Sequence, residues 1–242
     1  MLAASDLELT GRLHGITAEL RPGELTAICG PNGAGKSSLL ACLAGLIAPD
    51  QGEATLEARP VNAIPARERA RAIGYLPQVH EAAWDISVET LVALGRLPHA
   101  DADCAAIEAA ITRMDLTALR HRPLSCLSGG ETARAHLARV LAGTPRWILA
   151  DEPLANLDLG HAAALLTTLK ALTREGAGVV VVLHDLASAM NHADRVLVLA
   201  EGRLNADGAP EQALRDDNIA RCWGVQMRWL GEPGRRALAP AG

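Results

Sequence analysis

The stretch GPNGAGKS, from Gly30 to Ser37, decides the fold of this 242-residue chain. It fits the pattern G-x-x-x-x-G-K-[ST], in which a glycine-rich loop at a helix start surrounds the phosphates of a nucleotide. Among 23 Lys and Arg residues Lys36 is one of two lysines, and its slim ammonium fits between β- and γ-phosphate oxygens better than a planar guanidinium. A glycine-rich turn before an ordinary helix is the alternative. The complete fit favours a nucleoside triphosphate site.

Each part of this loop has an expected role. Backbone N–H groups of Gly33 to Ser37 are expected to surround the β-phosphate, where a Cβ would block the approach of the backbone. The Ser37 hydroxyl is expected to coordinate Mg²⁺, and Ser38 to contact the α-phosphate. The predicted ATP-binding set is Gly30, Pro31, Asn32, Gly33, Ala34, Gly35, Lys36, Ser37 and Ser38.

Strands and helices alternate around the loop. Leu25–Cys29 is an apolar run that leads into it, and Trp147–Ala150 and Gly178–Leu183 are two further apolar runs. Such runs are typical of parallel strands covered on both faces, and Ala162–Leu172 is expected to be a helical crossover between the last two. This order predicts an α/β, doubly wound fold of the P-loop NTPase type. A helical stripe follows the loop at Leu39, Leu40, Leu43 and Leu46.

The region 81–144 has a different character, because its apolar spacing is helical and no run predicts a central strand. We therefore predict one domain over residues 1–242, with a nucleotide-binding core from 1–80 and 145–231 and an inserted helical subdomain at 81–144. The Pro/Gly/Arg-rich tail 232–242 is expected to be flexible. The expected helices of the subdomain are Val88–Gly95, Ala105–Met114 and Thr132–Leu141.

Composition limits the possible functions. The chain is 49% apolar, and its net charge of −5 and pI near 5.9 argue against a basic nucleic-acid footprint. It has no secretory signal pattern and no apolar stretch near the roughly 20 residues that span a bilayer. Five scattered cysteines predict reduced cytosolic thiols, and the eight histidines lack zinc-ligand spacing. Work at a membrane would therefore require docking on another subunit.

A second part of the phosphate site is predicted in ILADEP, Ile148 to Pro153. Two carboxylates at the C-terminal end of a buried strand lie where such sheets bind ligands. We expect Asp151 to hold Mg²⁺ through water and Glu152 to act as general base toward the attacking water. A solvated Asp-Glu turn is the alternative, and the P-loop makes it the weaker one.

Two further residues complete the predicted catalytic set. His184 ends the apolar strand in VLHD, where a histidine is more often structural, but here it could reach the γ-phosphate. Gln78, in YLPQ, could touch both Mg²⁺ and the water. The predicted catalytic residues are therefore Glu152, His184 and Gln78, and the predicted metal ligands are Ser37, Gln78 and Asp151.

The segment LSGGE, Leu127 to Glu131, predicts a second helix start that binds an anion. Ser128 and Glu131 fit a capping box, which explains the pattern without any function. Gly129 and Gly130 nevertheless leave bare N–H groups at the positive end of the helix. Two phosphate-binding helix starts in one chain need an explanation.

In order and spacing, the motifs GPNGAGKS, YLPQ, LSGGE, ILADEP, ANLD and VLHD resemble the ATP-binding subunit of ABC transporters over essentially the whole chain. The resemblance implies a RecA-like core with N-terminal antiparallel strands, ATP and Mg²⁺ as cofactors, and no nucleic-acid partner. It also implies a head-to-tail homodimer, in which Ser128–Glu131 of one copy covers the ATP held by Lys36 of the other. Asp158 resembles a residue of the loop that crosses this interface.

The segment Val88–His99 resembles the one that follows the Gln loop in ATPases of iron–siderophore, haem and cobalamin importers. The resemblance implies two multi-span permease subunits, a periplasmic substrate-binding protein that acts through them, and a peripheral position on the cytoplasmic face of the inner membrane. An ABC ATPase for another transported substrate is one alternative. A soluble ABC ATPase acting on DNA or ribosomes would need a long coiled coil or a second cassette. A P-loop phosphotransferase would leave LSGGE without a purpose.

Two departures from the family pattern bear on the nucleotide site, whereas a third, Leu154 where a Thr is common, is expected to be harmless. Glu131 stands where the family usually has Gln, which puts an extra carboxylate near the γ-phosphate unless the capping box holds it. No aromatic residue for adenine lies between Leu7 and His14, and Tyr75, the single tyrosine of a chain without Phe, is on the wrong side. We expect Arg12 or His14 to stack on the base instead.

Overall fold

The computed structural model describes residues 1–78, 85–101, 103–155 and 157–241. Its central sheet consists of β3 (Leu25–Cys29), β6 (Ile73–Leu76), β7 (Trp147–Ala150), β8 (Gly178–Val182), β9 (Arg195–Ala200) and β10 (Arg203–Gly208). The strand order is β10-β9-β3-β8-β7-β6, with β10 antiparallel to β9 and the other strands parallel. This is the mostly parallel α/β sheet that the sequence predicted.

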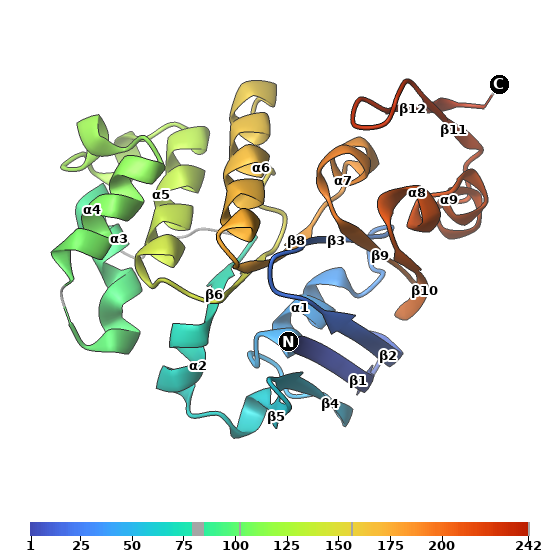
Figure 1. Cartoon of the computed structure of the whole chain (residues 1–242), viewed down its shortest axis with the longest axis horizontal. Coiled ribbons are helices and arrows are strands. Elements are labelled where there is room, and N and C mark those ends of the chain that lie inside the picture. Colours follow the sequence, from blue (N-terminus) through green and yellow to red (C-terminus); the bar gives the residue numbers. More distant parts are fainter. Residues whose placement is uncertain (79–84, 102, 156, 242) are drawn as a thin grey trace.

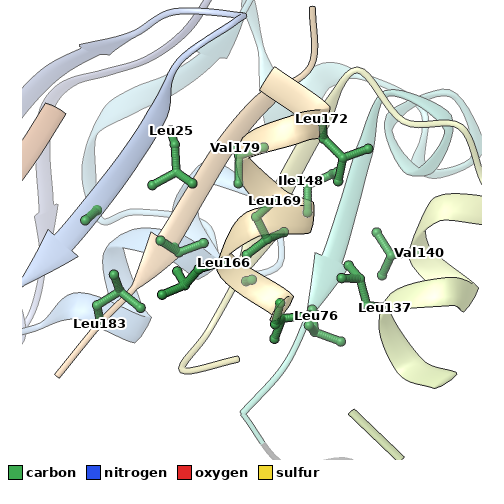
Figure 2. Packing of buried hydrophobic residues seen from close by; sticks show 14 of the residues in the cluster. Leu25, Leu76, Leu137, Val140, Ile148, Leu166, Leu169, Leu172, Val179 and Leu183 are labelled. Carbon is green, nitrogen blue, oxygen red and sulfur yellow. The ribbon is translucent and has the colours of Figure 1, made fainter. Parts of the chain in front are cut away.

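The middle strands are largely apolar because both of their faces are covered. In β8, Val179 and Val181 belong to one hydrophobic cluster, whereas Val180 and Val182 belong to the other. Figure 2 shows the first cluster, in which leucines of α6 (Leu159–Arg174) lie against the strands. The P-loop, Gly30–Ser37, follows one of these rigid strands and is therefore held on a well-packed base.

A smaller antiparallel sheet covers the other side of the P-loop helix α1 (Lys36–Leu43). Leu39 and Leu40 of α1 share one cluster with residues of both sheets. The predicted stripe was wrong at Leu46, which lies beyond the helix and is 58% exposed. The helix ends earlier because Gly45 takes a left-handed φ of 66°. The smaller sheet has the order β2-β1-β4-β5, formed by β1 (Leu2–Leu9), β2 (Leu13–Leu20), β4 (Gln51–Leu56) and β5 (Arg59–Pro60).

The helices of residues 85–144 form a group beside the central sheet, coloured green in Figure 1. Within its described residues this stretch has no named strand, only an isolated bridge between Ser87 and Pro123. The last helix of this stretch begins at Gly129, three residues before the predicted start, because Ser128 caps it. These elements are α3 (Val88–Ala93), the 3-10 helix η2 (Leu94–His99), α4 (Cys104–Arg113), α5 (Gly129–Ala142) and two short 3-10 turns, Thr117–Leu119 and Leu124–Cys126.

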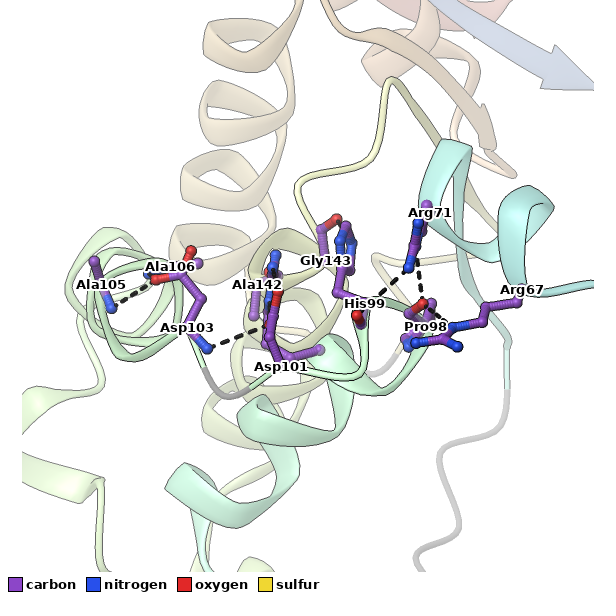
Figure 3. Close-up of polar contacts among 11 residues, drawn as sticks. Arg67, Arg71, Pro98, His99, Asp101, Asp103, Ala105, Ala106, Ala142 and Gly143 are labelled. Atoms are coloured by element: carbon purple, nitrogen blue, oxygen red, sulfur yellow. Dashed lines mark hydrogen bonds and ion pairs between the residues drawn. The ribbon is translucent and has the colours of Figure 1, made fainter.

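Hydrogen bonds attach η2, the segment after α3, to the helix 66–72 on one side and to α5 on the other (Figure 3). Two arginines of α2 (Ala66–Ala72), which follows a 3-10 turn, donate to the Pro98 carbonyl at 2.7 and 2.8 Å. On the other side, the buried Arg96 side chain donates to both carboxylate oxygens of Asp101 and to the Ala142 carbonyl at the end of α5. The segment is therefore attached to both α2 and α5.

The C-terminal part, for which the sequence predicted a flexible tail, forms a two-stranded hairpin. Its last residues pair with an earlier strand, and Asn191 exchanges two hydrogen bonds with the backbone of Arg236. Gly231 and Gly234 adopt the left-handed backbone conformation in the turn of this hairpin. The glycines of this segment therefore form a turn between two strands. Among the described residues no helix has the length and apolar character needed to cross a membrane. The remaining elements are α7 (Leu186–His192), α8 (Pro210–Ala213), α9 (Asp216–Trp223), β11 (Met227–Leu230) and β12 (Ala237–Pro240).

Candidate active site

The predicted catalytic residues follow neighbouring strands of the central sheet. β3 leads into the P-loop, β8 into His184, β7 into Asp151 and Glu152, and β6 into Gln78. These strands are consecutive in the order β3-β8-β7-β6, and all run in the same direction. Because carboxyl ends of parallel strands meet at one edge of a sheet, the side chains converge there.

The P-loop surrounds an open cavity of about 260 Å³. Two glycines are required by close backbone approaches: a Cβ on Gly35 would lie 2.6 Å from the Arg12 carbonyl oxygen, and one on Gly30 would lie 2.1 Å from that of Leu199. Both also have positive φ angles, 95° and 155°. The described lining residues are Arg12, Asn32, Gly33, Ala34, Gly35, Lys36, Ser37, Ser38 and Glu152, so this cavity gathers most of the predicted ATP-binding set.

Lys36 is held inside the loop by neutral groups. Its Nζ donates to the carbonyl oxygens of Gly30 and Pro31, at 2.9 Å each. Burial lowers the pKa of Lys36, and the nearby charges of Glu152 and Asp151 only partly oppose this shift. An ammonium that is buried with no ion pair among the described residues gains from the arrival of a polyanion. The geometry therefore suits a triphosphate.

Ser37 and Asp151 provide oxygen ligands of the kind that Mg²⁺ prefers. The Ser37 hydroxyl donates to Asp151 Oδ1 at 3.0 Å. Burial raises the pKa of the Asp151 carboxyl, while the hydrogen bond from Ser37 lowers it. A cation beside this buried carboxylate would offset the cost of its desolvation. One carboxylate and one hydroxyl, completed by phosphate and water, fit Mg²⁺.

Glu152 is held between two side chains. Its Oε2 accepts a hydrogen bond from Gln78 Nε2 at 2.6 Å, and its Oε1 lies 2.5 Å from His184 Nε2. The backbone of Glu152 has a φ of 50°, a left-handed conformation that is costly for a residue with a Cβ. The structure thus brings together the three residues predicted to be catalytic, with Glu152 in the middle.

The LSGGE segment forms the predicted capping box at the start of α5. Ser128 Oγ accepts from the backbone N of Glu131 at 3.3 Å, and Glu131 Oε2 accepts from the backbone N of Ser128 at 2.8 Å. The latter hydrogen bond lowers the pKa of the Glu131 carboxyl. No residue of this segment is among the described lining of the P-loop cavity. Within one chain, the two helix starts predicted to bind anions therefore remain separate.

Asp158 caps the next helix, α6, and accepts a hydrogen bond from the backbone N of His161 at 2.8 Å. The sequence placed this helix start at Ala162, so the pairing of His161 with Asp158 was not predicted. An Asp followed three residues later by a side chain that can return to it is an N-cap pattern, and that signal was available.

Comparison with known proteins identifies the family. A family model described as ABC transporter matches residues 13–155. The chain belongs to the ABC transporter family. The hemin import ATP-binding protein HmuV of Pseudomonas putida is 40% identical to this ABC ATPase over 233 residues, covering 92% of this chain and 91% of that protein. HmuV of Nocardia farcinica is 44% identical over 216 residues, covering 87% and 75% respectively.

Solved structures of ABC transporters share the fold of this ABC ATPase. One subunit, cbiO1 of Clostridium perfringens, superposes with a TM-score of 0.79 at 26% identity and covers 91% of this chain and 92% of that one. An inward-facing metal-chelate type ABC transporter superposes with a TM-score of 0.85 at 24% identity, over 100% of this chain and 97% of that one. The chain is an ATPase subunit of its family, in which ATP hydrolysis is coupled to transport.

Proposed function

We propose that this ABC ATPase powers the import of haem or of an iron chelate through separate membrane subunits. Two relatives that match most of its length are named hemin import ATP-binding proteins. The resemblance of Val88–His99 to the corresponding segment of iron and cobalamin importers supports the same group. An ABC ATPase for another transported substrate is the alternative, because no residue of the nucleotide site would touch the transported molecule.

The observation that carries the hydrolytic mechanism is Glu152 held between Gln78 and His184 beside the P-loop. Glu152 accepts a proton from water while the water oxygen bonds to the γ-phosphorus. The bond from that phosphorus to the β–γ bridging oxygen breaks, and the products are ADP and phosphate. Lys36 neutralises charge on the phosphates, and His184 is placed to contact the γ-phosphate.

Mg²⁺ would be held by Ser37 and Asp151, with Gln78 as a further oxygen donor. When bound, it would neutralise charge between the β- and γ-phosphates. The amide nitrogen of Gln78 already donates to Glu152, and its carbonyl oxygen, which has no partner among the described residues, could contact a cation or a water. One side chain, that of Gln78, would therefore contact both the general base and the metal ion.

A second copy of the chain would complete the site. The Ser128–Glu131 helix start lies outside the P-loop cavity of its own chain, as expected if it covers ATP on a partner copy. Next to Asp158, Leu159 is 91% exposed, although it is a large apolar residue. An apolar side chain uncovered beside an interface loop favours burial against another protein. We therefore propose a head-to-tail homodimer.

The membrane partners would dock near η2. Leu94 and Leu97 are 41% and 69% exposed on a segment that hydrogen bonds fix between α2 and α5. A rigid segment with exposed leucines suits a cytoplasmic segment of a permease. We propose two permease subunits, a periplasmic binding protein that delivers the substrate to them, and a position on the cytoplasmic face of the inner membrane. The helical region 81–144 would act as a subdomain that transmits the motion.

The decisive test of the mechanism is Glu152→Gln. The amide keeps the shape of the side chain but cannot take the proton, so ATP should bind while turnover falls by roughly 100-fold or more. Gel filtration with ATP should then show a trapped dimer, and the wild-type chain with ADP serves as the monomer control. A monomer at high protein and ATP concentrations would contradict the shared site.

The transported substrate is tested in the cell. A strain lacking this gene should lose growth on haem or on an iron chelate as sole iron source, and the gene on a plasmid should restore it. The gene carrying Glu152→Gln is the matched control and should not restore growth. Unchanged growth on every iron source, together with a growth defect on cobalamin, would instead indicate that cobalamin is the transported substrate.

A further inference from the structure

The ring of His161, on α6, lies against the first turn of α5. A Cβ built on Gly130 would be 3.0 Å from Cγ of the His161 ring, 3.1 Å from Nδ1 and 3.2 Å from Cδ2. Three ring atoms at nearly equal distances mean that the ring covers the Cα of Gly130. The glycine therefore leaves the space that the imidazole fills. This contact joins the start of α5 to the start of α6.

The same ring is attached to Asp158. His161 Nδ1 lies 2.7 Å from Asp158 Oδ2, and the backbone N of His161 donates to Oδ1 at 2.8 Å. The hydrogen bonds from His161 lower the pKa of Asp158, so this carboxylate is ionised at neutral pH. An ordinary helix cap needs only the bond to the backbone N–H. The second bond, made by the ring, fixes the direction of the imidazole.

We propose that His161 is a positioning residue that holds Asp158 and the Ser128–Gly130 helix start in one arrangement within each copy. This inference rests on the proposed function, which places both elements at the interface between two copies. Linked by His161, they would meet the partner copy as one preorganised surface. The exposed Leu159 lies in the same helical turn and would be covered by the same contact.

The physical effect is on dimer closure and not on nucleotide binding by one copy. Without the ring, the two helix starts are free to move separately, and closure around ATP must order both of them. His161 is not among the described residues that line the P-loop cavity, so the first binding of ATP does not involve it. A residue that only supports the fold would weaken both steps.

The test compares three variants in the Glu152→Gln background. His161→Ala removes both contacts, His161→Phe keeps a flat ring on Gly130, and His161→Asn keeps a short hydrogen-bond donor near Asp158. Sedimentation with saturating ATP measures the dimer dissociation constant, and nucleotide titration at low protein concentration measures binding to single copies. Thr167→Ala is the matched control, because within the described residues the hydroxyl of this exposed α6 residue donates to the Ala163 carbonyl of its own helix.

The Ala variant should weaken the dimer by roughly tenfold, the scale expected when a hydrogen bond and a packing contact are lost, and should leave single-copy nucleotide affinity within about twofold. Phe and Asn should lie between Ala and the parent. If the Ala variant does not fold, the Phe and Asn variants carry the same comparison against Thr167→Ala.

Three results have separate meanings. An unchanged dimer constant in His161→Ala overturns the positioning role but leaves the proposed function intact. An equal loss of single-copy nucleotide binding also overturns it, because His161 would then only support the fold. A Glu152→Gln parent that stays monomeric with ATP overturns the proposed function itself, and the positioning role with it.

Discussion

Gln78 Nε2 donates a hydrogen bond of 2.6 Å to Oε2 of Glu152, although the two residues are 74 positions apart in the chain. The register of β6 and β7 explains this contact. Leu76 pairs with Ala150, and each of the two polar residues stands two positions past its member of that pair. The orientation of the proposed base is therefore set by the pairing of two buried parallel strands.

We expect Gln78→Ala to lower kcat by roughly tenfold and to leave KM for ATP within about twofold, because it frees the carboxylate of Glu152 without touching the P-loop. Steady-state ATPase assays measure both constants. Gln78→Glu should lower kcat further, since it puts a second carboxylate beside the first. A raised KM with an unchanged kcat would instead show that Gln78 binds nucleotide.

Lys36→Met should separate nucleotide binding from folding. The thioether keeps an apolar stem but removes the ammonium, so ATP affinity should fall by about 100-fold or more. Without nucleotide, the free energy of unfolding should stay within about 1 kcal/mol of wild type, because burial already disfavours the charged form. Urea unfolding with and without ATP measures both effects. A large loss of stability in the absence of ATP would contradict this account of Lys36.

Much of the fold could be predicted from local pattern. β3 and β7 have the predicted bounds. A short apolar run that ends at a glycine or a carboxylate indicates a buried strand and its end without information from the rest of the chain. The order of the strands in the central sheet could not be predicted from such local runs. β8 lies between β3 and β7, and this placement depends on pairing between distant segments. The C-terminal hairpin was missed for the same reason, since its contacts with α7 are far apart in sequence.

The sequence also left open which residue faces the base. Arg12 and His14 were equivalent candidates, two positions apart. In the structure Arg12 lines the P-loop cavity, whereas the backbone of His14 is bonded to Gly202 and its ring contacts the same glycine. Which of two nearby side chains faces a cavity depends on how the β1–β2 turn packs on other segments, and periodicity carries no such information.

The Arg96–Asp101 pair should make stability depend on pH. Hydrogen bonds from Arg96 lower the pKa of Asp101 from 3.8 to about 2, with smaller contributions from the backbone N of Asp103 and the charge of His99. A carboxyl whose pKa is lower in the folded chain stabilises fully above its unfolded pKa and loses this effect as pH falls toward 2. Asp101→Asn should therefore lower the free energy of unfolding by the same amount throughout pH 5 to 8, and this loss relative to wild type should shrink below about pH 4. Urea unfolding at each pH measures it. A difference that does not change with pH would indicate lost packing instead.

Glu131→Gln should hydrolyse ATP as fast as the wild type or faster. The amide oxygen can still accept from the backbone N of Ser128, and a negative charge near the partner's γ-phosphate is removed. Glu131→Ala is the informative comparison, because it loses the bond from the Ser128 backbone N, one half of the capping box, and should cost up to about 1 kcal/mol of stability. ATPase assays and thermal unfolding of both variants separate the two effects. A large loss of rate in Glu131→Gln would show that the carboxylate itself is required.

Arg12 should act on the base in the way that an aromatic ring does in related proteins. Arg12 lines the cavity and its guanidinium is flat, so stacking worth about 1 kcal/mol would lower KM about fivefold for any purine. Arg12→Ala should then raise KM for ATP and GTP by the same factor, and Arg12→Tyr should restore it. His14→Ala, two residues away, is the matched control and should change neither constant. Because a stacked side chain does not read the edge of the base, ATP and GTP should be hydrolysed with similar efficiency by the wild type. A strong preference for ATP that survives Arg12→Ala would mean that another residue recognises adenine.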